Sequence, residues 1–97
     1  MFSKVPIDVN KIKRENQNLN QELLRVAIMA ELDAINLYEQ MADMVDSEDL
    51  KKVLTDVAQE EKTHVGEFQT MLLRMDKEQV KELAKGKNEV EELTGKK

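Results

Sequence analysis

The sequence predicts an all-α protein, an antiparallel two-helix hairpin followed by a short C-terminal helix. Apolar residues recur at steps of three and four in two long stretches, which is typical of one face of a helix. Capping residues stand where those stretches begin, and no stretch alternates in the manner of a strand. We divide the chain into an extended or mobile arm, residues 1–18, and a helical unit, residues 19–97.

The first helix is predicted from about Asn20, whose side chain can accept hydrogen bonds from the free N–H groups of the first turn. Its repeating face consists of Leu24, Ala27, Ile28, Glu31, Ile35 and Tyr38. The periodicity fades at residues 43–46, so we expect a tight turn centred near Asp46.

The second helix is expected to open at Asp46 or Ser47, because either residue can cap it. Its repeating face consists of Leu50, Val53, Leu54, Val57, Glu61, His64, Val65, Phe68 and Leu72. A third segment starts at Asp76 in a pattern like a capping box, and Gly86 is expected to end it. One more short helical piece is predicted to finish near Leu93.

Two apolar stripes facing each other make a small core for a chain of 97 residues. A second hairpin packed on the first would bury all four stripes, so we expect a dimer that forms a four-helix bundle. The five internal Met residues are expected to fill gaps in this core.

Composition excludes several classes of protein. The net charge is −5, Lys and Arg are scattered among the acids, and the aromatic content is 3%, which argues against nucleic-acid binding. No apolar run approaches the roughly 20 residues of a membrane span. The chain contains no Cys, which fits a reducing compartment. We therefore expect a soluble, cytoplasmic protein.

Three polar residues interrupt the apolar stripes, namely Glu31, Glu61 and His64. Buried carboxylates normally have a partner or a metal, because leaving one unpaired costs several kcal/mol, on the order of the penalty for a buried ion. Glu31 lies 15 residues before Asp46 and Glu61 lies 15 residues after it. In an antiparallel hairpin both would stand about 22 Å above the turn, with His64 one helical turn away.

A Glu on one helix opposite Glu-x-x-His on the next is half of the ligand set of di-iron four-helix bundles. Two copies of this chain would supply four Glu and two His, hence two iron ions per dimer. Carboxylates with one imidazole per ion favour Fe(II) or Mn(II) over structural Zn. The sequence thus predicts catalysis and metal binding at Glu31, Glu61 and His64, with O₂ accepting the electrons. A helical adaptor with an interfacial Glu/His network, without redox metal, is the alternative.

Two segments, residues 29–40 and 60–64, resemble the signature helices of the encapsulated ferritins, and the likeness covers residues 20–94. It implies a ferroxidase centre at the interface of a homodimer, assembly of dimers into a decameric ring, and an encapsulin shell that stores the oxidised iron. Glu31, Glu61 and His64 match the iron ligands of that family. Tyr38 matches an aromatic residue that supports the ligands, and Asp33 matches one acid of a metal-entry site.

The chain departs from the family at three points. Ala30 and Leu37 stand where some members have an acid and a Trp, which leaves the entry site in question. No shell-targeting peptide follows Leu93, so the chain is either the ferritin-like portion of a fusion to the shell protein or a protein that uses no shell.

A further alternative is that the chain forms half of a rubrerythrin-like peroxidase. This alternative is disfavoured, because the chain has no Cys for an electron-transfer iron site.

Overall fold

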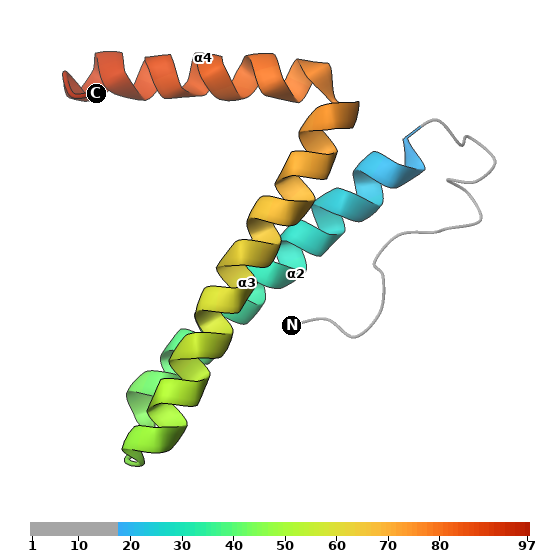
Figure 1. Ribbon diagram of the computed structural model, residues 1–97. Coiled ribbons are helices and arrows are strands. Elements are labelled where there is room, and N and C mark those ends of the chain that lie inside the picture. Colours follow the sequence, from blue (N-terminus) through green and yellow to red (C-terminus); the bar gives the residue numbers. More distant parts are fainter. Residues whose placement is uncertain (1–17) are drawn as a thin grey trace.

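The computed structural model describes residues 18–97, and this part of the chain forms three helices and no strand (Figure 1). The helices are α2 (Leu19–Met44), α3 (Glu48–Met75) and α4 (Lys77–Thr94). The predicted all-α class is therefore confirmed. The arm predicted for residues 1–18 lies outside the described residues, apart from Asn18. No helix between residues 18 and 97 is long and apolar enough to cross a membrane.

The helix α2 begins two residues earlier than predicted. Asn18, not Asn20, is its N-cap residue, and the backbone N–H of Glu22 donates to the carbonyl of Asn18 at 2.9 Å. The Asn18 side chain makes no capping hydrogen bond, so the first turn is held by backbone bonds alone. Asn20 was wrongly chosen because either Asn satisfies the preference for a capping residue, and the pattern does not separate them.

The turn between α2 and α3 lies where the sequence predicts it. Val45 is extended, Asp46 is at the centre, and Ser47 caps α3 by accepting a hydrogen bond from the N–H of Leu50 at 3.1 Å. A connection this short forces α3 back along α2. The two helices run side by side as an antiparallel hairpin (Figure 1).

The core of the hairpin is thin and made of small or aliphatic side chains. Its buried members are Ala34, Ile35, Ala42, Leu54, Ala58 and Leu72. The alanines allow the two helix axes to lie close together, but they bury little apolar area each. Many larger apolar side chains remain exposed on the single chain, among them all five internal Met residues. The single chain does not bury these Met residues, and the expectation that they fill gaps in the core of a four-helix bundle stays a prediction.

A sharp elbow at Asp76 separates α3 from α4. Asp76 leaves the helical conformation (φ −114°, ψ 87°), and its Oδ1 accepts from the N–H of Gln79 at 3.0 Å, as expected of a cap. Its Oδ2 binds the guanidinium of Arg25 at 2.8 Å. The Gln21 side chain donates to the carbonyl of Met75 at 3.2 Å. The start of α2 is thus tied to the elbow.

The helix α4 runs without interruption through Gly86, so the predicted stop at that residue is wrong. A glycine in a helix interior costs about 1 kcal/mol relative to Ala, which weakens a helix without ending it. The helix ends instead at Gly95, whose φ of 68° is the left-handed conformation that favours glycine. The α4 helix contains no buried residue and projects away from the hairpin (Figure 1).

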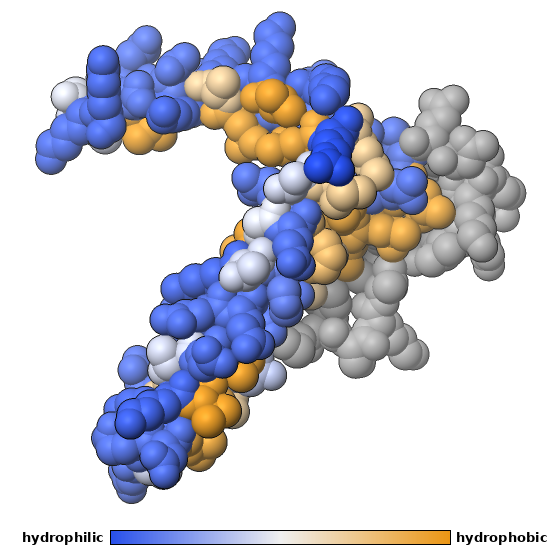
Figure 2. Space-filling view, in the orientation of Figure 1, coloured by the Kyte–Doolittle hydropathy of each residue, from blue (hydrophilic) through white to orange (hydrophobic). Residues whose placement is uncertain are grey.

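The shape of the chain is far from compact. Its radius of gyration is 17.2 Å, whereas a compact domain of this length would have about 12.5 Å. The excess comes from the thin hairpin and the projecting α4. Both elements expose apolar side chains that a compact monomer would bury (Figure 2).

Candidate metal centre

Three side chains predicted to bind metal converge in the middle of the hairpin. Nδ1 of His64 lies 3.5 Å from Oε2 of Glu31 and 3.5 Å from Oε2 of Glu61. One ligand atom from each residue fits within 4.8 Å of the other two. Two carboxylate oxygens and one imidazole nitrogen at these separations could hold one cation between them.

The position of the turn explains why these residues meet. With Asp46 at the centre of the connection, Glu31 on α2 and Glu61 on α3 lie at the same height along the hairpin. His64 follows Glu61 by three residues and therefore lies on the same face of α3. An insertion or deletion of two residues in the turn would move the two helices by about 3 Å and separate the cluster.

The negative charges of the cluster favour the binding of a cation. The Glu31 and Glu61 side chains are each 18% exposed, whereas His64 is 42% exposed. Oε2 of Glu31 is buried, and it accepts no hydrogen bond from any described residue. A buried carboxylate oxygen without a donor is costly unless a cation neutralises it. The cluster is closed on the side of the glutamates and open on the side of His64.

The surface around the cluster is apolar and follows seven-residue steps. Each of the three ligand candidates occupies a line of otherwise apolar or aromatic side chains. These lines are Leu24, Glu31 and Tyr38 on α2, Leu54, Glu61, Phe68 and Met75 on α3, and Leu50, Val57, His64 and Met71 on α3. Seven-residue spacing is typical of helices that pack at small crossing angles in bundles. Leu50, Met71 and Met75 are all exposed in the single chain.

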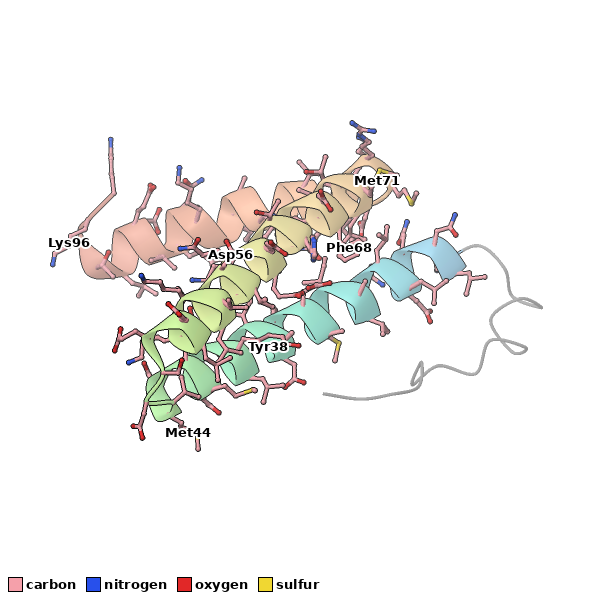
Figure 3. All side chains as sticks on the ribbon, turned by 60° about the horizontal axis from the view of Figure 1, so that its bottom comes forward. Tyr38, Met44, Asp56, Phe68, Met71 and Lys96 are labelled. Atoms are coloured by element: carbon pink, nitrogen blue, oxygen red, sulfur yellow. The ribbon has the colours of Figure 1, made fainter. Side chains whose placement is uncertain are left out.

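An apolar cleft of about 460 Å³ opens on one side of the cluster, towards the elbow. It is lined by Asn20, Leu23, Leu24, Ala27, Phe68, Met71 and Met75. Figure 3 labels Phe68 and Met71 on the part of α3 that forms this cleft. From the sequence, the Met residues are expected only to fill the core. The spacing of Met71, seven residues after His64, is the signal that places it on the same line of α3 as His64, about 10 Å away by helical rise.

Two further predicted site residues lie apart from the cluster. Tyr38 is half-buried two turns along α2 from Glu31, about 10 Å by helical rise, and no hydrogen bond joins it to Glu31, Glu61 or His64 (Figure 3). Asp33 is half-buried on α2, and its carboxylate is not among the converging ligand atoms. Their roles, support of the ligands for Tyr38 and metal entry for Asp33, stay predictions.

The relatives found by comparison with known proteins are consistent with one another. A family model described as rubrerythrin matches residues 22–95. The chain is 55% identical over 95 residues to the ferritin-like-encapsulin shell fusion protein of Pyrococcus furiosus, covering 98% of this chain and 28% of that protein. It is 46% identical over 56 residues to the encapsulin nanocompartment cargo protein EncC of Myxococcus xanthus, covering 58% of this chain and 43% of that protein.

A solved structure is also similar. The crystal structure of the encapsulated ferritin domain from Pyrococcus furiosus matches with a TM-score of 0.76 and 50% sequence identity. The match covers 98% of this chain and 89% of that one. The chain spans less than half the length of the two curated relatives it matches, but nearly all of this separately solved domain.

Proposed function

Because the chain belongs to the rubrerythrin family, and within it to the encapsulated ferritins, we propose that it is a ferroxidase that oxidises Fe(II) to Fe(III). The observation that carries the proposal is the convergence of Glu31, Glu61 and His64 within 4.8 Å, with a buried Glu31 oxygen to which no residue between 18 and 97 donates a hydrogen bond. That arrangement suits a divalent cation better than it suits an empty salt-bridge network.

The donor set fits Fe(II) as the substrate. Each chain offers two carboxylates and one imidazole, so two chains offer four carboxylates and two imidazoles for two iron ions. Glu61 would bridge or chelate iron, and Glu31 and His64 would complete the ligand set. Each Fe(II) gives up one electron, and O₂ accepts the electrons from the pair. The carboxylates stabilise the higher charge of the ferric product.

A second copy of the chain is part of the proposal. Apart from the buried Leu54, the apolar side chains in the lines that contain the ligands are half-exposed or exposed on the single hairpin. Packing two hairpins face to face would bury these lines and the cleft beside them, producing a four-helix bundle with both half-sites inside. The prediction of a homodimer, and of dimers joined into a larger, decameric ring, belongs to this proposal.

The names of the relatives suggest where the ferric iron is stored. One relative is a fusion of a ferritin-like part with an encapsulin shell protein, and another is a cargo protein of an encapsulin nanocompartment. We extend the proposal accordingly: this chain works in the cytoplasm inside an encapsulin shell, which stores the ferric iron. An open hairpin encloses no volume of its own in which a mineral could collect.

The test is aerobic oxidation of Fe(II), followed by ferric absorbance, for the native chain, Glu61→Ala and buffer. Glu60→Ala is the matched control, because Glu60 is an exposed neighbour outside the cluster. We expect rapid oxidation by the native chain and the control, with about one iron bound per chain, and loss of oxidation in Glu61→Ala.

Sedimentation with and without Fe(II) tests the shared site. An unchanged monomer under both conditions would contradict the two-copy centre. If a folded native chain oxidised iron no faster than buffer, the cluster would instead be the polar network of a helical adaptor.

A further inference from the structure

The helix α4 carries an apolar face that nothing in the described part of the chain covers. Its four large apolar residues are all exposed, at 43% for Val80, 45% for Leu83, 58% for Val90 and 87% for Leu93. The helix touches α3 only near the elbow and has no contact with α2. Figure 2 shows hydrophobic side chains of α4 on the concave side of the elbow, and the opposite side of α4 is hydrophilic. Most of the stability of a protein helix comes from tertiary packing, and this 18-residue helix packs only at its first turn, so a partner would stabilise it.

The spacing of these residues is symmetric. Leu83 and Val90 lie equally far from the midpoint between Gly86 and Lys87, and so do Val80 and Leu93. Two copies of α4 laid antiparallel with this midpoint in common would place Leu83 of each against Val90 of the other. The outer residues would pair in the same way. A two-fold axis generates this arrangement, because both copies use the same surface.

Gly86 lies at the point where the two helices would cross. A Cβ added there would meet no atom within 4 Å, so packing within the single chain does not require a glycine. The residue nevertheless costs about 1 kcal/mol relative to Ala in a helix interior. The missing side chain allows another helix backbone to approach closely.

The charges on α4 favour the antiparallel direction. Residues 77–87 contain four Lys and two Glu, whereas residues 88–94 contain three Glu and no Lys. A parallel pair would place like-charged halves together. An antiparallel pair places the basic half of each helix beside the acidic half of the other, which is favourable.

From these observations we propose that α4 pairs antiparallel with α4 of a second copy, centred on Gly86, at a contact separate from the metal centre. With one two-fold contact at the hairpin face and another at α4, each chain would touch two different copies. Such a chain can join metal-centred dimers into a larger assembly. Four side chains from each helix form a small interface, so the contact depends on the raised local concentration that the other interface provides.

Disulfide trapping tests the pairing, because the chain has no Cys of its own. Leu83→Cys and Val90→Cys proteins are mixed anaerobically with Fe(II) in a glutathione redox buffer, so that the metal-centred contact is present, and the mixed dimer is measured by mass. Paired Cα atoms in an antiparallel crossing come within disulfide range. We expect roughly tenfold more mixed dimer than homodimer of either variant. The control mixture, Lys81→Cys with Glu92→Cys, has the same register on the opposite face and should remain largely reduced.

Homodimers of Leu83→Cys and of Val90→Cys in place of the mixed dimer would overturn the antiparallel register. Mixed dimer no more abundant than in the control mixture would overturn the contact itself. Gly86→Leu gives a second measurement, since Leu is a better helix former than Gly and the variant keeps its helix. Sedimentation of the full chain should then show dimers in place of a larger assembly. Neither readout depends on iron oxidation, so this proposal and the proposed function can fail separately.

Discussion

Replacement of Glu61 by Gln should stabilise the metal-free protein and remove the stabilisation that Fe(II) provides. Gln has nearly the size and shape of Glu but carries no charge. Without metal, the substitution removes repulsion between the carboxylates of Glu31 and Glu61. With metal, it removes one of the charged ligands. The same change should therefore shift the melting temperature in opposite directions under the two conditions.

The magnitude follows from the geometry. The ligand atoms of the cluster lie within 4.8 Å of one another, and at that separation two unit charges repel by about 1 kcal/mol in bulk water and by about 3.5 kcal/mol at an effective dielectric constant of about 20. Both side chains are 18% exposed, so the value lies between these limits. His64 lies 3.5 Å from each carboxylate and offsets part of the repulsion. We expect a gain of about 1 to 2 kcal/mol, or a rise of roughly 4–16 °C in Tm for a domain of this size.

The assay is thermal unfolding followed by far-ultraviolet circular dichroism, first with chelator and then anaerobically with Fe(II). A metal present at 100 times its dissociation constant stabilises the native protein by about 2.7 kcal/mol, which should exceed the gain from the substitution. Glu60→Gln is the control, because it removes the same charge from an exposed neighbour. Its melting temperature should follow that of the native chain in both solutions.

Two results would refute this reasoning. If Glu61→Gln melted at or below the native temperature in chelator, the two carboxylates would not repel each other in the folded protein. If Fe(II) raised the melting temperature of Glu61→Gln as much as that of the native chain, Glu61 would not be a ligand.

Three further predictions concern the scaffold and use urea unfolding of the chain in chelator. Asp76→Ala should lower the free energy of unfolding by about 1.5 kcal/mol, because it removes both a helix cap and an ion pair. Arg25→Ala, which removes only the ion pair, should lower it by at most about 0.5 kcal/mol. Equal losses in the two variants would show that the cap contributes nothing. Ser47→Ala should cost about 1 kcal/mol through loss of the α3 cap, and an unchanged midpoint would argue against that hydrogen bond. Gly66→Ala should stabilise the chain by up to about 1 kcal/mol, since a Cβ there meets no atom within 4 Å; a loss of stability would indicate that another helix approaches Gly66 closely.

The sequence by itself determined the two long helices, the turn between them, and the residues that face each other across the hairpin. Steps of three and four residues define a helix face whatever the tertiary structure, and Ser47 and Asp76 cap helices through bonds to residues three positions ahead. The level alignment of Glu31 and Glu61 followed from counting residues on either side of Asp46, because helical rise is constant.

The sequence did not determine features that depend on free-energy differences or on distant residues. Gly86 weakens a helix by about 1 kcal/mol, which does not by itself end one, so the continuity of α4 could not be read from that residue alone. The N-cap of α2 is a similar case, because Asn18 and Asn20 are equally suitable by residue type and the sequence pattern does not separate them. The ion pair of Arg25 with Asp76 joins residues 51 positions apart, and no local pattern predicts it.

Only the tertiary structure determined which apolar side chains are buried. Apolar residues recur along the whole stripes of α2 and α3, but only six side chains of these two helices are buried, because two helices can enclose no more than the strip between them. The same geometry leaves Met71, the open side of His64 and the whole face of α4 exposed. A helix pattern shows that a face needs burial, whereas the number and direction of the packed neighbours determine whether one chain can supply it.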